Sequence, residues 1–251
     1  MVPSNGWAEL RLPIASLIRG RVAQHVLKRY GATVLPHKID VPAQAGRKKW
    51  TMLPVSGTAL LLIDVINDLA FHGSEQLVQQ AEPMSKRLAA FKRRARRAGI
   101  PVVYVNDNFG QWRSDFRQTV EHCTSRRSPG RAVSERLRPT TQDYFVLKPK
   151  HSGFYDTTLD TLMDDLHITR VIVTGIAGNI CVLFTANDAY MRGMRIYAPA
   201  DCIVSNAAEE NTNALEQIEI VLKGDTTPST ELRFKAGVRG KRQRTSGHIR
   251  G

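Results

Sequence analysis

The sequence has few cysteines and no long apolar run. Its three cysteines are widely spaced, odd in number and without a Cys-x-x-Cys pair. This argues against a disulfide framework and a structural zinc site, and it favours a reducing, cytoplasmic location. No window approaches the roughly 18 consecutive apolar residues of a membrane span. The first residues also lack the compact basic-then-apolar pattern of a secretory signal. We therefore expect no membrane-spanning segment.

Acidic residues are scarce at both ends of the chain. Residues 1–50 contain nine Lys and Arg against two acids, and residues 235–251 contain six against none. These ends carry the whole formal net charge of +13, so residues 51–234 are balanced. Basic ends can contact nucleic acid or an anionic surface, and that alternative stays open. Because such ends are more often solvated appendages, we do not expect a nucleic acid partner.

The charge distribution suggests three parts. Residues 1–56 form a basic N-terminal extension, in which the spacing of apolar residues over 8–30 indicates an amphipathic helix. Residues 57–234 form the functional domain, and residues 235–251 form a basic tail. With 42% hydrophobic residues overall, the chain can build one substantial core.

Short apolar runs alternate with helical patterns in the central part. The predicted strands span residues 59–64, 101–106, 143–148, 170–175 and 194–200. The predicted helices span residues 75–98, 156–167 (with Asp156 as a cap), 180–192 and 206–223, and a short one lies near 114–122. This alternation predicts a three-layer, Rossmann-like α/β fold, a mostly parallel sheet with helices on both faces. Sites in such folds lie at the carboxyl ends of strands, where the strand order reverses.

Three reactive side chains meet that condition. Asp64 ends the first strand, Lys148 ends the third, and Cys181 follows the fourth after a short turn. Taken singly, each has an ordinary explanation as a turn cap, a surface lysine or a small buried hydrophobe. A parallel sheet, however, brings all three to one edge, which makes them the best catalytic candidates.

The surroundings of Cys181 give its thiol a reason to react. Gly175 and Gly178 permit a tight turn from strand to helix, and Cys181 falls in the first helical turn. Unpaired N–H groups and the positive end of the helix dipole favour a thiolate there. A nearby lysine would lower the thiol pKa further. The sequence thus predicts a thiol with a reason to ionise, beside N–H groups that can receive an oxyanion, and a carboxylate within reach can take the thiol proton.

Four stretches carry a family resemblance. They are ALLLIDVINDLAF (59–71), VLKPKHSGF (146–154), TGIAGNICVLFTANDAYMRG (174–193) and APADCIVS (198–205). In this order they resemble the isochorismatase-like cysteine hydrolases, a superfamily that includes nicotinamidases and N-carbamoylsarcosine amidohydrolase. The resemblance covers about residues 57–225.

The resemblance implies a catalytic triad of Asp64, Lys148 and Cys181. It also implies a cis peptide bond between Ile176 and Ala177, and an oxyanion site made by the backbone N–H groups of Ala177 and Cys181. Related enzymes commonly self-associate, so a homo-oligomer is expected.

Two departures refine the function. Nicotinamidases of the superfamily bind a metal through an Asp and paired histidines, whereas no histidine lies between residues 73 and 121 here. We therefore predict neither metal nor other cofactor. The retained Cys181 favours cleavage of an amide-type C–N bond in a small molecule through a thioester intermediate. Hydrolysis of an isochorismate-like vinyl ether, with Asp64 as proton donor, remains the alternative.

Several side chains just beyond strand ends could wall a substrate pocket. The candidates are Phe71, Asn106, Trp112, Phe154 and Tyr155. His151 lies in the segment where the superfamily tolerates different residues, and it is left outside the triad. Cys202 is expected to be an inert thiol, and the sequence gives no signal for Cys123, which lies in the irregular region.

Overall fold

The central sheet is parallel throughout. The computed structural model describes residues 50–71, 73–110 and 115–235. Six strands form the sheet: β2 (Thr58–Ile63), β3 (Val102–Asp107), β4 (Tyr144–Lys148), β5 (Arg170–Ile176), β6 (Arg195–Tyr197) and β7 (Ile203–Val204). Their order is β4-β3-β2-β5-β6, with β7 paired to β5. All these pairings are parallel, which confirms the predicted α/β class.

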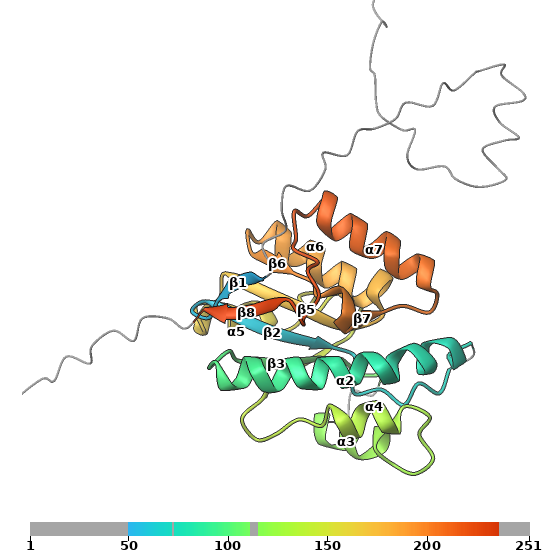
Figure 1. Cartoon of the computed structure of the whole chain (residues 1–251). Coiled ribbons are helices and arrows are strands. Elements are labelled where there is room, and N and C mark those ends of the chain that lie inside the picture. The colour runs from blue at the N-terminus through green and yellow to red at the C-terminus, as the bar shows by residue number, and fades with distance from the viewer. Residues whose placement is uncertain (1–49, 72, 111–114, 236–251) are drawn as a thin grey trace, which may run out of the picture. The chain divides into compact units, whose positions relative to one another are not determined.

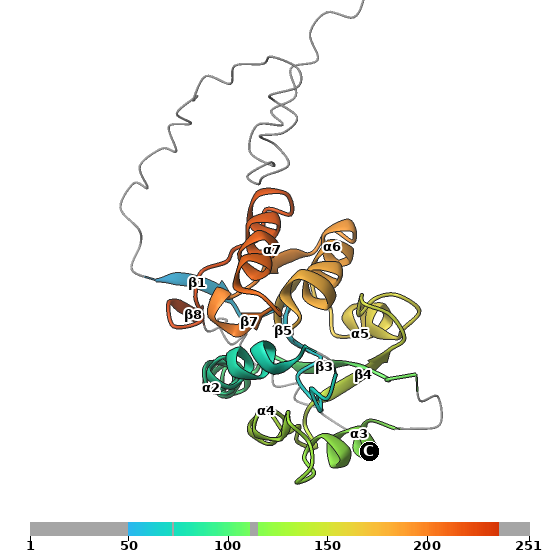
Figure 2. The same ribbon diagram turned by 90° about the vertical axis from the view of Figure 1, so that its right-hand side faces the viewer.

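Helices cover both faces of the sheet. They are α2 (Glu75–Arg97), α3 (Phe116–Cys123), α4 (Arg131–Arg136), α5 (Leu159–Asp165), α6 (Leu183–Met191) and α7 (Ala208–Ile220). Figure 1 shows α2 below the sheet and α6 and α7 above it, and Figure 2 shows the same separation from the side. Strand β2 supplies both cores: Leu60 and Leu62 face the α2 side, and Leu61 and Ile63 face the other. This two-sided burial explains the unbroken apolar run in the sequence.

Two local features differ from the sequence prediction. Helix α4 lies within the stretch expected to be irregular, and it is held to the chain after β2 because Ser134 Oγ accepts a hydrogen bond from Asn67 N at 3.2 Å. Helix α5 begins at Leu159, so Asp156 is not its cap. Asp156 instead adopts a φ of 50°, and Thr157 Oγ1 accepts the Leu159 N–H at 3.1 Å.

A separate two-stranded parallel sheet joins distant parts of the chain. It pairs β1 (Thr51–Pro54) with β8 (Leu232–Lys235). Leu53 and Leu232 are fully buried, and the ring of Phe234 stacks on Phe91 of α2 at 5.4 Å between centroids. Residues 51–54, assigned above to the extension, therefore form part of the folded domain, as does Lys235 of the predicted tail. Residues 1–49 of the extension and 236–251 of the tail lie outside the described residues.

Candidate active site

The three predicted catalytic residues meet at the carboxyl edge of the sheet. From β2 the chain adds β3 and β4 on one side, then crosses to β5 and β6 on the other, so the order reverses between β2 and β5. Asp64 directly follows β2, with a φ of 49°, and Cys181 follows β5 in the π-helical turn Gly178–Val182. Lys148 ends β4, two strands from Asp64, so its long side chain reaches across the end of β3.

Lys148 connects the other two side chains. Its Nζ lies 2.9 Å from Asp64 Oδ2 and donates to Cys181 Sγ at 3.4 Å. It also donates to Lys150 O at 3.1 Å and lies 3.6 Å from Asp107 Oδ2. Asp64 Oδ1 accepts the Asp107 N–H at 2.7 Å. Lys148 is fully buried and Asp64 is 5% exposed, so these contacts are largely shielded from water.

The electrostatics of Cys181 differ from the sequence prediction. Burial raises the pKa of its thiol to about 12, and the negative charge of Asp64 raises it further than Lys148 can lower it. The resting thiol is therefore protonated, and a base must remove its proton before the sulfur can react. The helix end and the lysine both favour a thiolate, but desolvation and the adjacent carboxylate outweigh them.

The pKa values of Asp64 and Lys148 each result from burial opposed by the charge of the other residue. Burial raises the pKa of Asp64 despite the favourable charge and hydrogen bond of Lys148. Burial alone would lower the pKa of Lys148, but the negative charge of Asp64 raises it above its ordinary value. Lys148 is thus a permanent cation, whereas Asp64 is a carboxylate with increased affinity for a proton.

Two glycines let the turn before Cys181 approach its neighbours closely. Gly175 has a φ of 116°, and a Cβ there would lie 2.1 Å from Ile63 O. A Cβ on Gly178 would lie 2.4 Å from Asn211 Oδ1. The peptide bond between Ile176 and Ala177 is cis, as the resemblance implied.

A cavity of about 340 Å³ opens beside the triad. Its lining comprises Asp64, Asn67, Phe71, Leu77, Asp107, Phe109, His151, Ile176, Ala177, Ile180, Cys181 and Asn206. It thus includes the predicted residues Phe71 and Ala177. Asn67, Asp107 and Phe109 were not predicted as lining residues, although Asp107 ends β3 and its position at a strand end is a signal for a site residue. Among the described residues, no group of three or more His, Cys, Asp or Glu side chains is placed to hold a metal ion.

The other predicted pocket residues lie elsewhere. Asn106 is fully buried, and its side chain bonds the backbone N and O of Ile66, so it fixes the chain after β2. Phe154 belongs to the core, with the Arg192 guanidinium 4.5 Å from its ring centre. Tyr155 is 53% exposed and outside the cavity lining. Trp112 lies outside the described residues.

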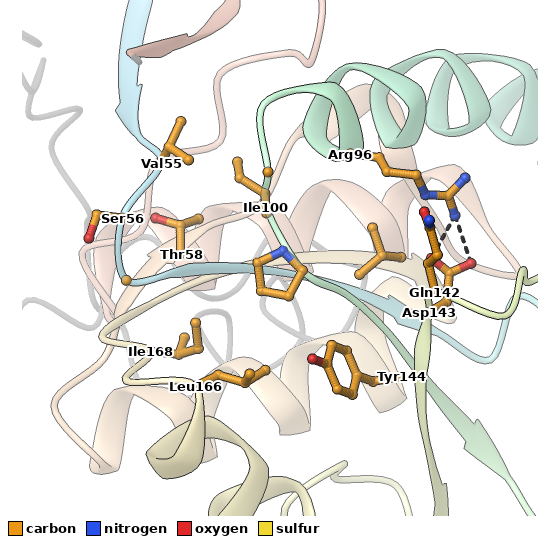
Figure 3. A pocket seen from close by; sticks show the side chains of 14 residues that line it. Val55, Ser56, Thr58, Arg96, Ile100, Gln142, Asp143, Tyr144, Leu166 and Ile168 are labelled. Atoms are coloured by element: carbon orange, nitrogen blue, oxygen red, sulfur yellow. Dashed lines mark hydrogen bonds and ion pairs between the residues drawn. The ribbon is translucent and has the colours of Figure 1, made fainter. Parts of the chain in front are cut away.

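A larger hollow of about 500 Å³ lies at the opposite, amino-terminal edge of the sheet (Figure 3). Its charged residues already form a pair, because Arg96 Nη2 donates to both carboxylate oxygens of Asp143 at 2.6 and 2.7 Å. No thiol lines it. The smaller cavity beside Cys181 is therefore the better candidate for chemistry.

In the described part of the chain, no helix is long and apolar enough to cross a membrane.

Comparison with known proteins agrees with this arrangement. Residues 58–229 match the family model of the isochorismatase domain. The chain is 43% identical over 174 residues to the uncharacterized isochorismatase family protein YaaI of Bacillus subtilis, covering 69% of this chain and 95% of that protein. It is 29% identical over 189 residues to the ureidoacrylate amidohydrolase RutB of Methylobacterium radiotolerans, covering 65% and 70%.

A solved structure shows the same fold. The N-carbamoylsarcosine amidase of Thermoplasma acidophilum is 28% identical and superposes with a TM-score of 0.55, covering 69% of this chain and 97% of that one. The sheet order, the family match and these relatives agree. The chain therefore belongs to the isochorismatase family and is a hydrolase with amidase-type relatives.

Proposed function

We propose that the protein hydrolyses an amide-type C–N bond of a small molecule, with Cys181 as nucleophile. The observation that carries this proposal is the bridge made by Lys148, whose Nζ lies 2.9 Å from Asp64 Oδ2 and 3.4 Å from Cys181 Sγ. A base and a thiol thus line the cavity, and the buried cation of Lys148 contacts both of them. Its volume of about 340 Å³ suits a small substrate.

In the first half of the reaction, Asp64 takes the proton of the Cys181 thiol as sulfur attacks the carbonyl carbon. The raised pKa of Asp64 suits it to hold that proton, and the raised pKa of Cys181 means that transfer accompanies attack. The backbone N–H groups of Ala177 and Cys181 stabilise the oxyanion. The C–N bond then breaks, the nitrogen takes the proton from Asp64, and a thioester remains on sulfur.

Water completes the reaction. Asp64 accepts a proton from a water molecule that attacks the thioester carbon, and it returns the proton to sulfur as the S–C bond breaks. Lys148 keeps its charge throughout, since both neighbours raise its pKa. It orients the carboxylate and the sulfur and offsets negative charge on either.

The names of the relatives guide the choice of substrates. Ureidoacrylate amidohydrolase and N-carbamoylsarcosine amidase both refer to substrates with a carbonyl between nitrogens. A panel of ureido acids and simple primary amides is therefore the first test set. We expect intact-protein mass spectrometry after rapid acid quench to detect an adduct whose mass is that of the acyl group.

The adduct should map to Cys181 and be absent in Cys181→Ala. Cys123→Ala is the matched control, because Cys123 is fully buried and outside the cavity, and it should retain the adduct and the turnover. Turnover of any C–N substrate at the normal rate by Cys181→Ala would refute the thioester route. Cleavage of a vinyl ether that survives in this variant and is lost in Asp64→Ala would instead support the isochorismatase-type alternative.

A further inference from the structure

A second hollow lies far from the reactive thiol and is lined by cations. It has a volume of about 610 Å³ and runs between α2 and the β8 segment, which Figure 2 shows side by side. Its lining comprises Lys86, Arg87, Ala90, Phe91, Arg94, Ser229, Thr230 and Arg233. Four of these eight residues are basic and none is acidic. Two acids outside the lining contact it: Glu82 Oε1 lies 3.4 Å from Lys86 Nζ, and the Asp201 carboxylate accepts hydrogen bonds from Ser229 N and Oγ at 2.6 and 2.8 Å.

Two of the cations are held in place by the fold. Arg94 donates from Nη1 to Leu232 O at 3.1 Å and from Nη2 to Ser229 O, and its guanidinium lies 5.2 Å from the centre of the Phe91 ring. Arg233 donates to Thr230 O at 2.7 Å and stacks 3.8 Å from the ring centre of Trp50. Charges fixed in this way lose little side-chain entropy when an anion binds.

The fixed cations also repel each other. Burial lowers the pKa of Arg94, and the positive charge of Arg233 lowers it further. An anion placed between them would relieve this repulsion. The solvent-exposed face of α2 accounts for Lys86 and Arg87. It does not account for Arg94 and Arg233, which backbone carbonyls hold near each other although no acid lines the hollow.

The sequence extends the charge beyond the hollow. Strand β8 ends at Lys235, and residues 235–251 contain six basic residues and no acid. The zero net charge of residues 51–234 argued against a nucleic acid partner, but it conceals the clustering of cations on α2 and β8.

We propose that the hollow between α2 and β8 binds the phosphodiester backbone of a nucleic acid. Regularly spaced phosphates match the several cations that line the hollow. The contact is to the backbone, so no sequence preference is expected.

The test is fluorescence anisotropy of the full chain with a labelled single-stranded RNA 20-mer and a labelled DNA duplex. The wild-type affinity should fall as salt rises, because each phosphate contact releases counterions. The variant Lys86→Glu with Arg87→Glu should bind about tenfold more weakly at 100 mM salt, and its log–log salt slope should be smaller by about 1.4 for RNA. The relative affinity for RNA and DNA identifies the kind of nucleic acid.

The matched control is Arg126→Glu with Arg127→Glu. Both arginines are exposed, and the net charge changes by the same amount as in the α2 variant. A loss of less than about threefold in this control would support the hollow. Equal losses in both variants would assign binding to net charge alone and overturn the proposal. Absence of binding to either nucleic acid, or binding only to phosphatidylglycerol vesicles, would also overturn it. If the glutamates lower the melting temperature, Lys86→Gln with Arg87→Gln gives the same comparison with a smaller change of charge.

Discussion

Replacing Asp64 with asparagine is expected to make the Cys181 thiol more reactive toward an alkylating reagent while abolishing hydrolysis. The carboxylate has two opposite effects in the proposed mechanism. It accepts the thiol proton during attack, but its negative charge also raises the thiol pKa. An amide removes both effects. The fold should tolerate the change, because Lys148 retains Asp107 Oδ2 at 3.6 Å as a counter-charge.

The size of the effect follows from the geometry. Lys148 Nζ lies 2.9 Å from Asp64 Oδ2 and 3.4 Å from Cys181 Sγ, so the carboxylate and the sulfur are within about 6 Å of each other. At an effective dielectric constant of about 20, the carboxylate charge at that distance destabilises the thiolate by about 3 kcal/mol. Removing this charge therefore lowers the thiol pKa by about 2. A less basic thiolate is also a weaker nucleophile. The net gain in alkylation rate at fixed pH is therefore about tenfold.

The assay is the rate of iodoacetamide labelling of Cys181 between pH 7 and 10, followed by peptide mass spectrometry. Cys181→Ala gives the background from Cys123 and Cys202, both of which are buried. Turnover of the substrate found by the adduct screen is measured on the same samples. Slower labelling in Asp64→Asn than in wild type would show that the carboxylate promotes thiol attack more than its charge opposes ionisation, and the electrostatic reasoning behind this prediction would be refuted.

Two further predictions concern stability. Gly175→Ala should prevent folding or lower the unfolding free energy severely, because the added Cβ would lie 2.1 Å from Ile63 O. Gly193→Ala is the comparison: its φ is 73°, but no atom lies within 4 Å of the added Cβ, so it should cost only about 1–2 kcal/mol. Similar urea denaturation midpoints for the two variants would contradict this. Burial lowers the pKa of Lys92 from 10.5 to about 8, although the amine donates to Tyr104 Oη at 2.7 Å. The unfolded chain therefore binds more protons between these values, so wild type should gain up to about 3 kcal/mol of stability relative to Lys92→Met as pH rises from 8 to 10.5. Urea titrations at pH 7.5 and 10 measure this difference, and an unchanged difference would show that Lys92 does not titrate in that range.

The sequence was most informative where one physical requirement decides the structure. A strand buried on both faces must be apolar throughout, so β2 could be recognised from residues 59–63 alone. Parallel strands bring their carboxyl ends together, so Asp64 and Cys181 could be placed at one edge before the sheet order was known. The pairing of β1 with β8 could not be predicted, because it joins segments about 180 residues apart that carry no matching pattern.

The site was harder to predict where burial decides the chemistry. The sequence shows the glycines, the helix and the lysine that favour a thiolate, but it does not show how deeply Cys181 is desolvated. The same limit applies to Asn106, whose position at the end of the predicted strand 101–106 suggested substrate binding. Its amide instead satisfies the backbone of Ile66, a need that arises only when the chain after β2 turns across the sheet.

The β1–β8 pair sets the limits of the autonomous folding unit. The segment that matches the family model, residues 58–229, excludes both strands. A chain excised at those positions would keep the whole triad but would lose Leu53, Leu232 and the Phe234 ring that covers Phe91. The α2 side of the core would then meet water. Boundaries for recombinant expression or domain grafting should accordingly enclose residues 50–235, since similarity to relatives understates what this fold needs to stay closed.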